Sequence, residues 1–381
     1  MKRIILVKYA SEIFLKGLNR NKFEKKLKEN IKKVLKDIDY EFITDQNRWF
    51  IAGEDLQGII DRVKRVFGIA ELCIVRMIPA EMEEIKVEAL KVMEDINPHD
   101  FKVETKRANK EFPINSLEVS RELGSHILSN MEDMKVNVSK PEYVLNIEIR
   151  KNAYVYEKKI KAIGGMPYGM NGSTMLMLSG GFDSPVAGYL MGRRGVELSC
   201  VYYHSSPYTS ERAKEKVKDL SKILASYTGH IKLYVVPFTD IQMGIVEKCR
   251  EDELTIIMRR FMMRLACELA SVKGIDSVTT GESVGQVASQ TMAGLIVSDD
   301  VADRPVFRPL IAMDKNDIMD VAREVGTYDT SILPYEDCCT IFVPKHPKTK
   351  PRLKEIIKSE EALDIELLVK EAINNTELIE F

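Results

Sequence analysis

The sequence lacks any apolar run of the length needed to cross a bilayer. It also lacks a signal peptide, because the opening Met1-Lys2-Arg3 leads only into a short run typical of a strand. Both absences argue against an integral membrane protein or a secreted protein. We therefore predict a cytoplasmic location.

Cysteine is scarce, with six residues in a chain of 381, at positions 73, 200, 249, 267, 338 and 339. This density is unlike the framework of a small secreted domain, so no disulfide scaffold is predicted. There is no C-x-x-C pair, and the five histidines form no evident cluster. The sequence therefore predicts no metal site built from protein side chains alone.

The net charge of −2 conceals a local excess of positive charge. Residues 1–36 hold twelve Lys and Arg against three Glu. Such a segment can lie along a nucleic-acid backbone, where released counterions supply most of the nonspecific affinity. A solvated helix face explains the same charges equally well.

What is present is the composition of a globular protein, 45% hydrophobic and 30% charged, with a length that suggests two or three units. The first unit, residues 1–60, follows a strand–helix–strand order typical of a ferredoxin-like α+β domain. Residues 61–165 form a second α+β module that ends in a hairpin.

The hydrophobic pattern changes in the third unit, residues 170–381, where short apolar segments typical of strands alternate with segments of helical periodicity. Its expected strands are 174–178, 197–203, 231–236, 277–280 and 306–310, and its expected helices are 184–194, 210–227, 240–272 and 315–326. This alternation predicts a doubly wound parallel sheet with right-handed crossovers. The predicted fold class is thus multidomain, α+β followed by α/β.

The most informative motif is Ser179-Gly180-Gly181-Phe182-Asp183-Ser184, which joins an apolar strand to a helix. The glycines let backbone N–H groups approach a phosphate, and the helix start adds its free amides and its dipole. No Gly-Lys-Ser/Thr follows, so the motif is not a Walker A loop. The alternative is an ordinary glycine turn between a strand and a helix.

This loop resembles that of the PP-loop ATP pyrophosphatases, which release pyrophosphate and transfer AMP to their substrate. Further motifs narrow the resemblance to the tRNA 4-thiouridine synthetase family: YYHSSPYTS at 202–210, MRR at 258–260, TGES at 280–283, ASQT at 288–291, RPLIAMDK at 308–315 and YEDCCT at 335–340. The resemblance covers nearly the whole chain. It implies a ferredoxin-like domain, a THUMP RNA-binding domain and a PP-loop catalytic domain.

Some family members carry an additional rhodanese domain with a persulfide-bearing cysteine. We expect the form that lacks it, because the sequence stops at Phe381 without one. This appendage supports thiazole formation in some relatives, so the resemblance does not decide whether this chain also serves thiazole formation.

The resemblance also implies which residues bind ATP: Met177, Leu178, Ser179, Gly180, Gly181, Asp183, Ser184, Tyr202, Tyr203, Arg259, Gly281 and Gln290. Several of these end neighbouring parallel strands, where ligands of open α/β sheets bind. For Tyr202 and Tyr203 ordinary strand packing is an equally good explanation. Arg259 could equally be an exposed arginine on a core-facing helix.

Four residues are predicted to be catalytic: Asp183, Lys315, Cys338 and Cys339. Asp183 beside a triphosphate requires Mg²⁺ or a positioning hydrogen bond to offset repulsion. Lys315 can stabilise charge on the α-phosphate as pyrophosphate leaves. Nearby cations favour the thiolate form of the cysteine pair, and the residues downstream favour Cys339 over Cys338 as the residue that handles sulfur.

We predict that Mg·ATP adenylates O4 of a tRNA uridine and that a persulfide or sulfide then displaces AMP to give 4-thiouridine. The expected partners are tRNA and a persulfide donor such as a cysteine desulfurase, and a homodimer is compatible with the sequence. The alternatives are another PP-loop tRNA-modifying ligase, or a nonenzymatic RNA-binding protein that senses ATP.

Overall fold

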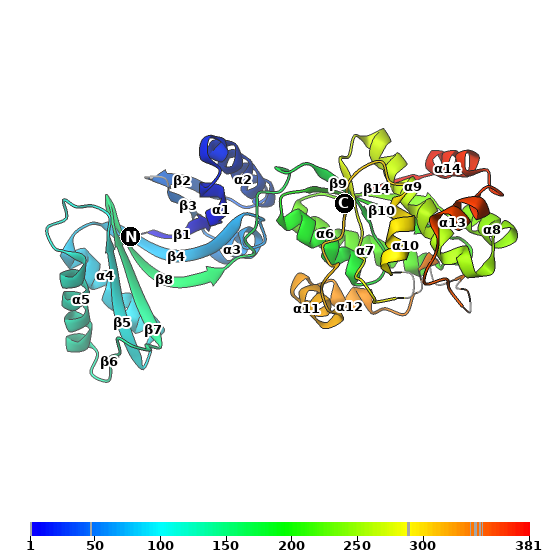
Figure 1. The fold of residues 1–381 in the computed structure, drawn as a ribbon. Coiled ribbons are helices and arrows are strands. Elements are labelled where there is room, and N and C mark those ends of the chain that lie inside the picture. Colours follow the sequence, from blue (N-terminus) through cyan, green and yellow to red (C-terminus); the bar gives the residue numbers. More distant parts are fainter. Residues whose placement is uncertain are drawn as a thin grey trace. The chain divides into compact units, whose positions relative to one another are not determined.

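The computed structural model describes residues 2–45, 48–287, 290–335, 337–338, 341–342, 344 and 346–381. The chain forms two compact units (Figure 1). Unit 1 comprises Met1–Phe14 and Ile31–Gly164, and unit 2 comprises Leu15–Asn30 and Gly165–Phe381. In the described part of the chain no helix is both long and apolar enough to span a membrane.

Unit 1 is built on one eight-stranded sheet of order β2-β3-β1-β4-β8-β7-β5-β6. Its helices and strands are β1 Lys2–Tyr9, α1 Ser11–Phe14, β2 Glu41–Asp45, β3 Arg48–Ala52, α3 Leu56–Val63, β4 Ile69–Pro79, α4 Met82–Ile96, β5 Asp100–Arg107, α5 Ser116–Asn130, β6 Lys135–Val136, β7 Tyr143–Ile149 and β8 Asn152–Lys161. Between α1 and β2 the chain forms η1 Gly17–Asn19 and α2 Arg20–Val34, of which residues up to Asn30 belong to unit 2.

The long strands β4 and β8 hold this sheet together, since they pair antiparallel from Glu71 with Lys161 to Pro79 with Asn152. β1 pairs with the other edge of β4, and β7 pairs with the other edge of β8. Both predicted α+β modules therefore share one continuous sheet. The boundary between them at residues 60 and 61 stays a prediction.

Unit 2 contains the predicted α/β architecture, with a six-stranded sheet of order β13-β12-β9-β10-β11-β14. Its elements are β9 Ser173–Met177, α6 Asp183–Arg193, β10 Glu197–His204, α7 Glu211–Thr228, β11 Lys232–Pro237, α8 Thr239–Lys248, η2 Glu251–Glu253, α9 Leu254–Lys273, β12 Ser277–Thr279, α10 Met292–Asp299, β13 Val306–Phe307, α11 Lys315–Val325, α12 Tyr328–Ser331, α13 Leu353–Glu360, α14 Ile365–Asn374 and β14 Glu377–Glu380. Five strands are parallel, which confirms the predicted fold class.

Unit 2 differs from the predictions in several details, since α10, α12, α13 and α14 were not predicted and β13 is shorter than the strand predicted over 306–310. The sixth strand, β14, lies antiparallel at the edge against β11, so the sheet is mixed. The single helix predicted over 240–272 is wrong, because the backbone at Cys249 is extended (φ −107°, ψ 165°) and separates α8 from α9. A periodic apolar pattern that continues across such a break cannot reveal it.

Helix α9 carries a deeply buried charge. Arg260 is only 2% exposed, and its Nε donates to Glu360 Oε1 at 2.9 Å. Glu360 also accepts two hydrogen bonds from Arg264, at 2.7 and 2.8 Å. These contacts tie α9 to the end of α13, and both charges depend on staying paired because water does not reach them.

Replacement of Glu360 by Gln should therefore destabilise unit 2. Removing one partner of a buried ion pair costs on the order of 3 kcal/mol, which corresponds to a melting temperature lower by about 6–12 °C in a unit of this size. Scanning calorimetry of the full chain measures the shift. The neighbouring Glu361 is exposed, so Glu361→Gln is the matched control. Equal melting temperatures for the two variants would contradict the prediction.

Candidate active site

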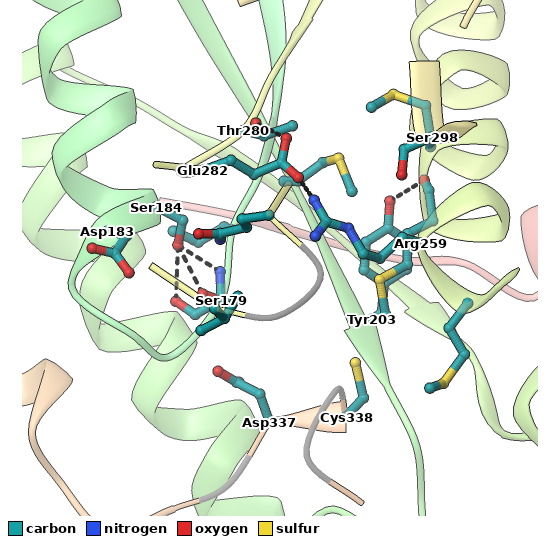
Figure 2. Close-up of a pocket in the computed structure, with 18 of the residues that line it drawn as sticks. Ser179, Asp183, Ser184, Tyr203, Arg259, Thr280, Glu282, Ser298, Asp337 and Cys338 are labelled. Atoms are coloured by element: carbon teal, nitrogen blue, oxygen red, sulfur yellow. Dashed lines mark hydrogen bonds and ion pairs between the residues drawn. The ribbon is translucent and has the colours of Figure 1, made fainter. Parts of the chain in front are cut away.

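A cavity of about 280 Å³ lies at the carboxyl ends of the central strands of unit 2. β9 is paired on one side with β10 and on the other with β12, so successive crossovers leave it in opposite directions. Ligands of doubly wound sheets bind at this switch point. The cavity is bordered by the ends of β9 and β10, by α9 and by the turn after β12 (Figure 2).

The structure brings most of the predicted nucleotide-binding residues together. Those that line the cavity are Met177, Leu178, Ser179, Asp183, Ser184, Tyr202, Tyr203, Arg259, Gly281 and Gln290, together with Cys338. Gly180 and Gly181 belong to the adjoining loop, and Lys315 starts α11 nearby. Cys339 lies outside the described residues, so its predicted role stays a prediction.

The glycine-rich loop is held by the two serines at its ends. The Ser179 N–H donates to Ser184 Oγ at 2.8 Å, and the two hydroxyl oxygens lie 3.0 Å apart. These bonds draw the end of β9 against the first turn of α6. They leave the Gly180 amide to a partner from another segment, described below.

Gly281 is required by a close approach of backbone. A Cβ atom at this position would lie 2.7 Å from the Ser184 nitrogen and 2.9 Å from the Asp183 carbonyl carbon. Any side chain here would push the turn after β12 away from α6, because contacts this short are essentially never observed.

Asp183 is the carboxylate at the start of α6. Burial raises the pKa of this carboxyl, while Gln286 and the Lys315 charge lower it. Lys315 Nζ lies 5.9 Å from the centre of the Phe182 ring, beside the loop. The predicted pair of an anion and a cation at the phosphate end of the site is therefore present, although Lys315 does not line the cavity.

A second charged group, missed in the sequence analysis, borders the cavity at Glu282. Its carboxylate forms ion pairs with Arg259 and with Arg308, the latter at 2.6 Å, and accepts a hydrogen bond from Thr280 Oγ1 at 2.9 Å (Figure 2). Glu282 is 8% exposed. Arg259 thus lines the cavity, and its charge is balanced by Glu282.

The cavity wall also offers polar atoms that no described residue satisfies. Gln290 Oε1 and Thr255 Oγ1 are both buried and accept or donate no hydrogen bond within the described part of the chain. Both residues line the cavity. Buried polar groups are almost always paired in native proteins, so such atoms indicate where a ligand supplies the partner. Thr255 was not predicted, because a threonine in a helix carries no sequence signal for binding.

Tyr202 and Tyr203 are packed in the strand and also line the cavity, and their contact with ATP stays a prediction. They are 1% and 5% exposed and line the cavity. The Tyr203 hydroxyl donates to the carbonyl oxygen of Met262 on α9, which fixes its ring by packing. The apolar side of the cavity is completed by Met258, Met262 and Met263, a surface suited to a flat aromatic ligand.

Asp337 and Cys338 complete the border of the cavity. Both carboxylate oxygens of Asp337 accept from the Gly180 N–H, at 2.9 and 3.1 Å. Burial raises the pKa of Asp337, whereas the Gly180 amide and the Lys216 charge lower it. Cys338 is buried and faces the cavity beside Asp337, opposite Arg259 and Glu282 (Figure 2). Neither Asp337 nor Lys216 was predicted as a site residue.

Comparison with known families agrees with this geometry. Residues 169–365 match the family model described as "Thiamine biosynthesis protein (ThiI)", residues 4–73 match "ThiI ferredoxin-like domain", and residues 79–156 match "THUMP domain".

Individual proteins are similar over their whole length. A protein of Clostridium perfringens (strain SM101 / Type A) named "Probable tRNA sulfurtransferase" is 69% identical, and one of the same name from Clostridium kluyveri (strain ATCC 8527) is 67% identical, each with 100% of both chains covered. Among solved structures, a 4-thiouridine synthetase in complex with RNA and bound ATP is 35% identical, with a TM-score of 0.93 and 100% of both chains covered.

The electrostatics of the site predict how Asp183 titrates. Because the Lys315 charge lowers the pKa of Asp183, Lys315→Met should raise that pKa above its value in the wild-type protein. Carboxyl ¹³C NMR measures it, with Asp183→Asn to assign the resonance. Lys315→Arg keeps the charge and should leave the pKa near the wild-type value. An unchanged or lower pKa in Lys315→Met would show that the two groups do not interact.

Proposed function

Because the chain belongs to the ThiI family, we propose that it is a tRNA sulfurtransferase that uses ATP to convert a uridine of tRNA to 4-thiouridine. The observation that carries this proposal is the cavity at the end of β9, where the glycine-rich loop, an apolar wall and two unsatisfied polar atoms meet. ATP offers a base for the wall and phosphates for the loop. The similar 4-thiouridine synthetase binds both ATP and RNA.

The reaction divides into activation and sulfur transfer. A uracil carbonyl oxygen is a poor leaving group, so O4 first forms a bond to the α-phosphorus of ATP while the bond to pyrophosphate breaks. A sulfur nucleophile then forms a bond to C4, and the oxygen leaves as part of AMP. Both steps transfer groups without net oxidation when sulfide is the nucleophile.

The residues divide along the same lines. Ser179, Gly180 and Gly181 present the loop amides to the phosphates, and the start of α6 adds its dipole. Lys315 stabilises negative charge as pyrophosphate leaves. Cys339, or in its place Cys338, carries the sulfur as a persulfide, whose terminal sulfur forms a bond to C4 as AMP leaves. A thiol reductant then cleaves the S–S bond, which releases 4-thiouridine and the cysteine thiol while the reductant is oxidised to a disulfide. The remaining predicted contacts hold adenine and ribose between the strand ends and α9.

Mg²⁺ belongs to the same proposal. Among the described residues no group of three or more His, Cys, Asp or Glu side chains could hold a metal ion. A single carboxylate, Asp183, fits Mg²⁺ nevertheless, because this ion commonly binds through one or two carboxylates, waters and the substrate phosphates. When bound, it would neutralise phosphate charge beside Asp183.

Unit 1 would hold the tRNA. A groove of about 760 Å³ in this unit is lined by Lys8, Arg48, Lys106 and Lys159, among other residues. Its lining residues other than Lys159 lie within the part of the chain that matches the ferredoxin-like and THUMP models. Glu104 and Glu148 also line the groove, and its cations suit a phosphate backbone. A cysteine desulfurase as persulfide donor, a homodimer and a cytoplasmic location complete the proposal on the strength of the family resemblance.

Activity is tested with unmodified tRNA, Mg·ATP and sulfide, followed by 4-thiouridine absorbance and AMP release. We expect both products in equal amounts. Asp183→Asn should lower kcat/KM by about 10²–10³-fold, the usual cost of losing an electrostatic group at a reacting centre. Asp329→Asn removes the same charge from the exposed start of α12 and should have no effect. Absence of both products with the wild-type protein would rule out tRNA thiolation.

The two cysteines are separated by supplying sulfur from a cysteine desulfurase and free cysteine in place of sulfide. We expect Cys339→Ser to lose thiolation while it still adenylates tRNA and releases pyrophosphate. Cys338→Ser should retain most of the activity and serves as the matched control. Reversed phenotypes would move the sulfur-handling role to Cys338, and full activity in both variants would remove the pair from the mechanism.

A further inference from the structure

The Gly180 amide of the glycine-rich loop is already occupied by an anion from the protein itself. Both oxygens of Asp337 lie within hydrogen-bond distance of this single N–H, at 2.9 and 3.1 Å. An amide in such a loop ordinarily binds a phosphate oxygen. The Asp337 carboxylate therefore stands where the proposed function requires an oxygen of the pyrophosphate group.

A buried cation accompanies this carboxylate. Lys216 on α7 is 5% exposed, and its Nζ donates to the Leu333 carbonyl at 2.8 Å. A Cβ atom on Gly180 would lie 3.2 Å from Lys216 Cδ and 3.2 Å from Asp337 Oδ1. The glycine is thus enclosed between the two side chains. Lys216 and Asp337 attract one another, since each charge moves the pKa of the other group toward its ionised form.

Asp337 is also joined by one peptide bond to the cysteine that faces the cavity. The Cys338 carbonyl accepts from Gln242 Nε2 at 2.9 Å, so the backbone is held on both sides of this peptide. A ligand that displaces the Asp337 carboxylate must therefore move or strain residues 337–338, here called the Cys338 segment. The glycine-rich loop and Cys338 are thus connected through the Asp337 carboxylate.

We propose that Asp337 is a positioning residue that occupies the pyrophosphate site of the glycine-rich loop until nucleotide binds, and that its displacement shifts the Cys338 segment and frees Lys216 to contact phosphate. The proposal rests on the ATP-dependent function proposed above. A pyrophosphate oxygen and the Asp337 carboxylate cannot both lie within hydrogen-bond distance of the Gly180 N–H without strong repulsion. Binding of pyrophosphate and docking of Asp337 therefore exclude each other. Departure of pyrophosphate after adenylation lets Asp337 return, which brings the cysteine segment back to the activated uridine.

The test compares inorganic pyrophosphate with AMP, because only the former needs the Asp337 position. In Asp337→Asn the amide oxygen can still accept from Gly180 but carries no charge, and charge-assisted bonds are roughly twice as strong as neutral ones. We expect the Kd of pyrophosphate to fall by about tenfold, with the Kd of AMP changed less than about twofold. Titration calorimetry of the full chain measures both, and Asp329→Asn is the control of equal charge.

Unchanged or weaker pyrophosphate binding by Asp337→Asn, with AMP binding retained, would overturn the displacement and leave the proposed function intact. A wild-type protein that binds neither ligand would overturn both. A purely structural role for Asp337 would change the two Kd values together and would likewise overturn the proposal.

A second measurement uses the wild-type protein and does not depend on any variant. Cys338 is 3% exposed, and peptide mapping after brief iodoacetamide treatment reports how fast its thiol is alkylated. Saturating pyrophosphate should accelerate the reaction by at least about fivefold, while AMP should not, because local opening sets the reactivity of a buried group. Equal rates with the two ligands would overturn the link between the loop and the cysteine segment.

Discussion

The architecture of the site depends on a close approach of two backbones, that of Gly281 after β12 and that of the first turn of α6. A Cβ atom at residue 281 would lie 2.7 Å from the Ser184 nitrogen, so no other residue fits there. The approach fixes the turn after β12 against the glycine-rich loop. It thereby places Glu282 and Arg259 on one side of the cavity and the loop amides on the other.

With these backbones fixed, the charges in and around the cavity must still be balanced, because the groups that line it are buried or only partly exposed to water. Each is paired within the protein: Asp183 is near Lys315, Glu282 lies between Arg259 and Arg308, and Asp337 is near Lys216. An unpaired buried charge would be costly. On the function proposed above, a nucleotide binds by replacing these internal partners.

Much of this could be predicted from the sequence, and the success has a physical reason. The alternation of strands and helices in unit 2 is a local signal in the sequence. The loop at 179–184 requires glycines followed by the start of a helix, so it too can be recognised from the sequence. The residues that end parallel strands, such as Met177, Tyr202 and Gly281, could be grouped because such ends meet at one sheet edge. Cys249 shows the limit, since a backbone break inside a continuous apolar pattern carries no signal.

The residues that the sequence did not reveal are those whose roles depend on distant partners. Lys216 is one of several lysines on the charged helix α7, and Asp337 is a single acidic residue before the cysteine pair. Neither position carries a distinct signal in the sequence. Only folding brings them to opposite sides of Gly180, from 36 positions after it and 157 positions after it. Glu282 was visible within a motif, but its partners, Arg259 and Arg308, come from a helix and from the segment after β13.

The placement of these residues on different elements explains how one cavity can perform two successive reactions. The activating groups lie on the ends of packed strands and helices, which hold a transition state in fixed geometry. The cysteines lie in a segment between α12 and α13, which is joined to the phosphate loop through the Asp337 carboxylate. On the displacement proposed above, pyrophosphate and the Asp337 carboxylate need the same Gly180 amide, so the first step controls the position of Asp337 and Cys338. The order of the two steps is then a consequence of one shared hydrogen-bond donor.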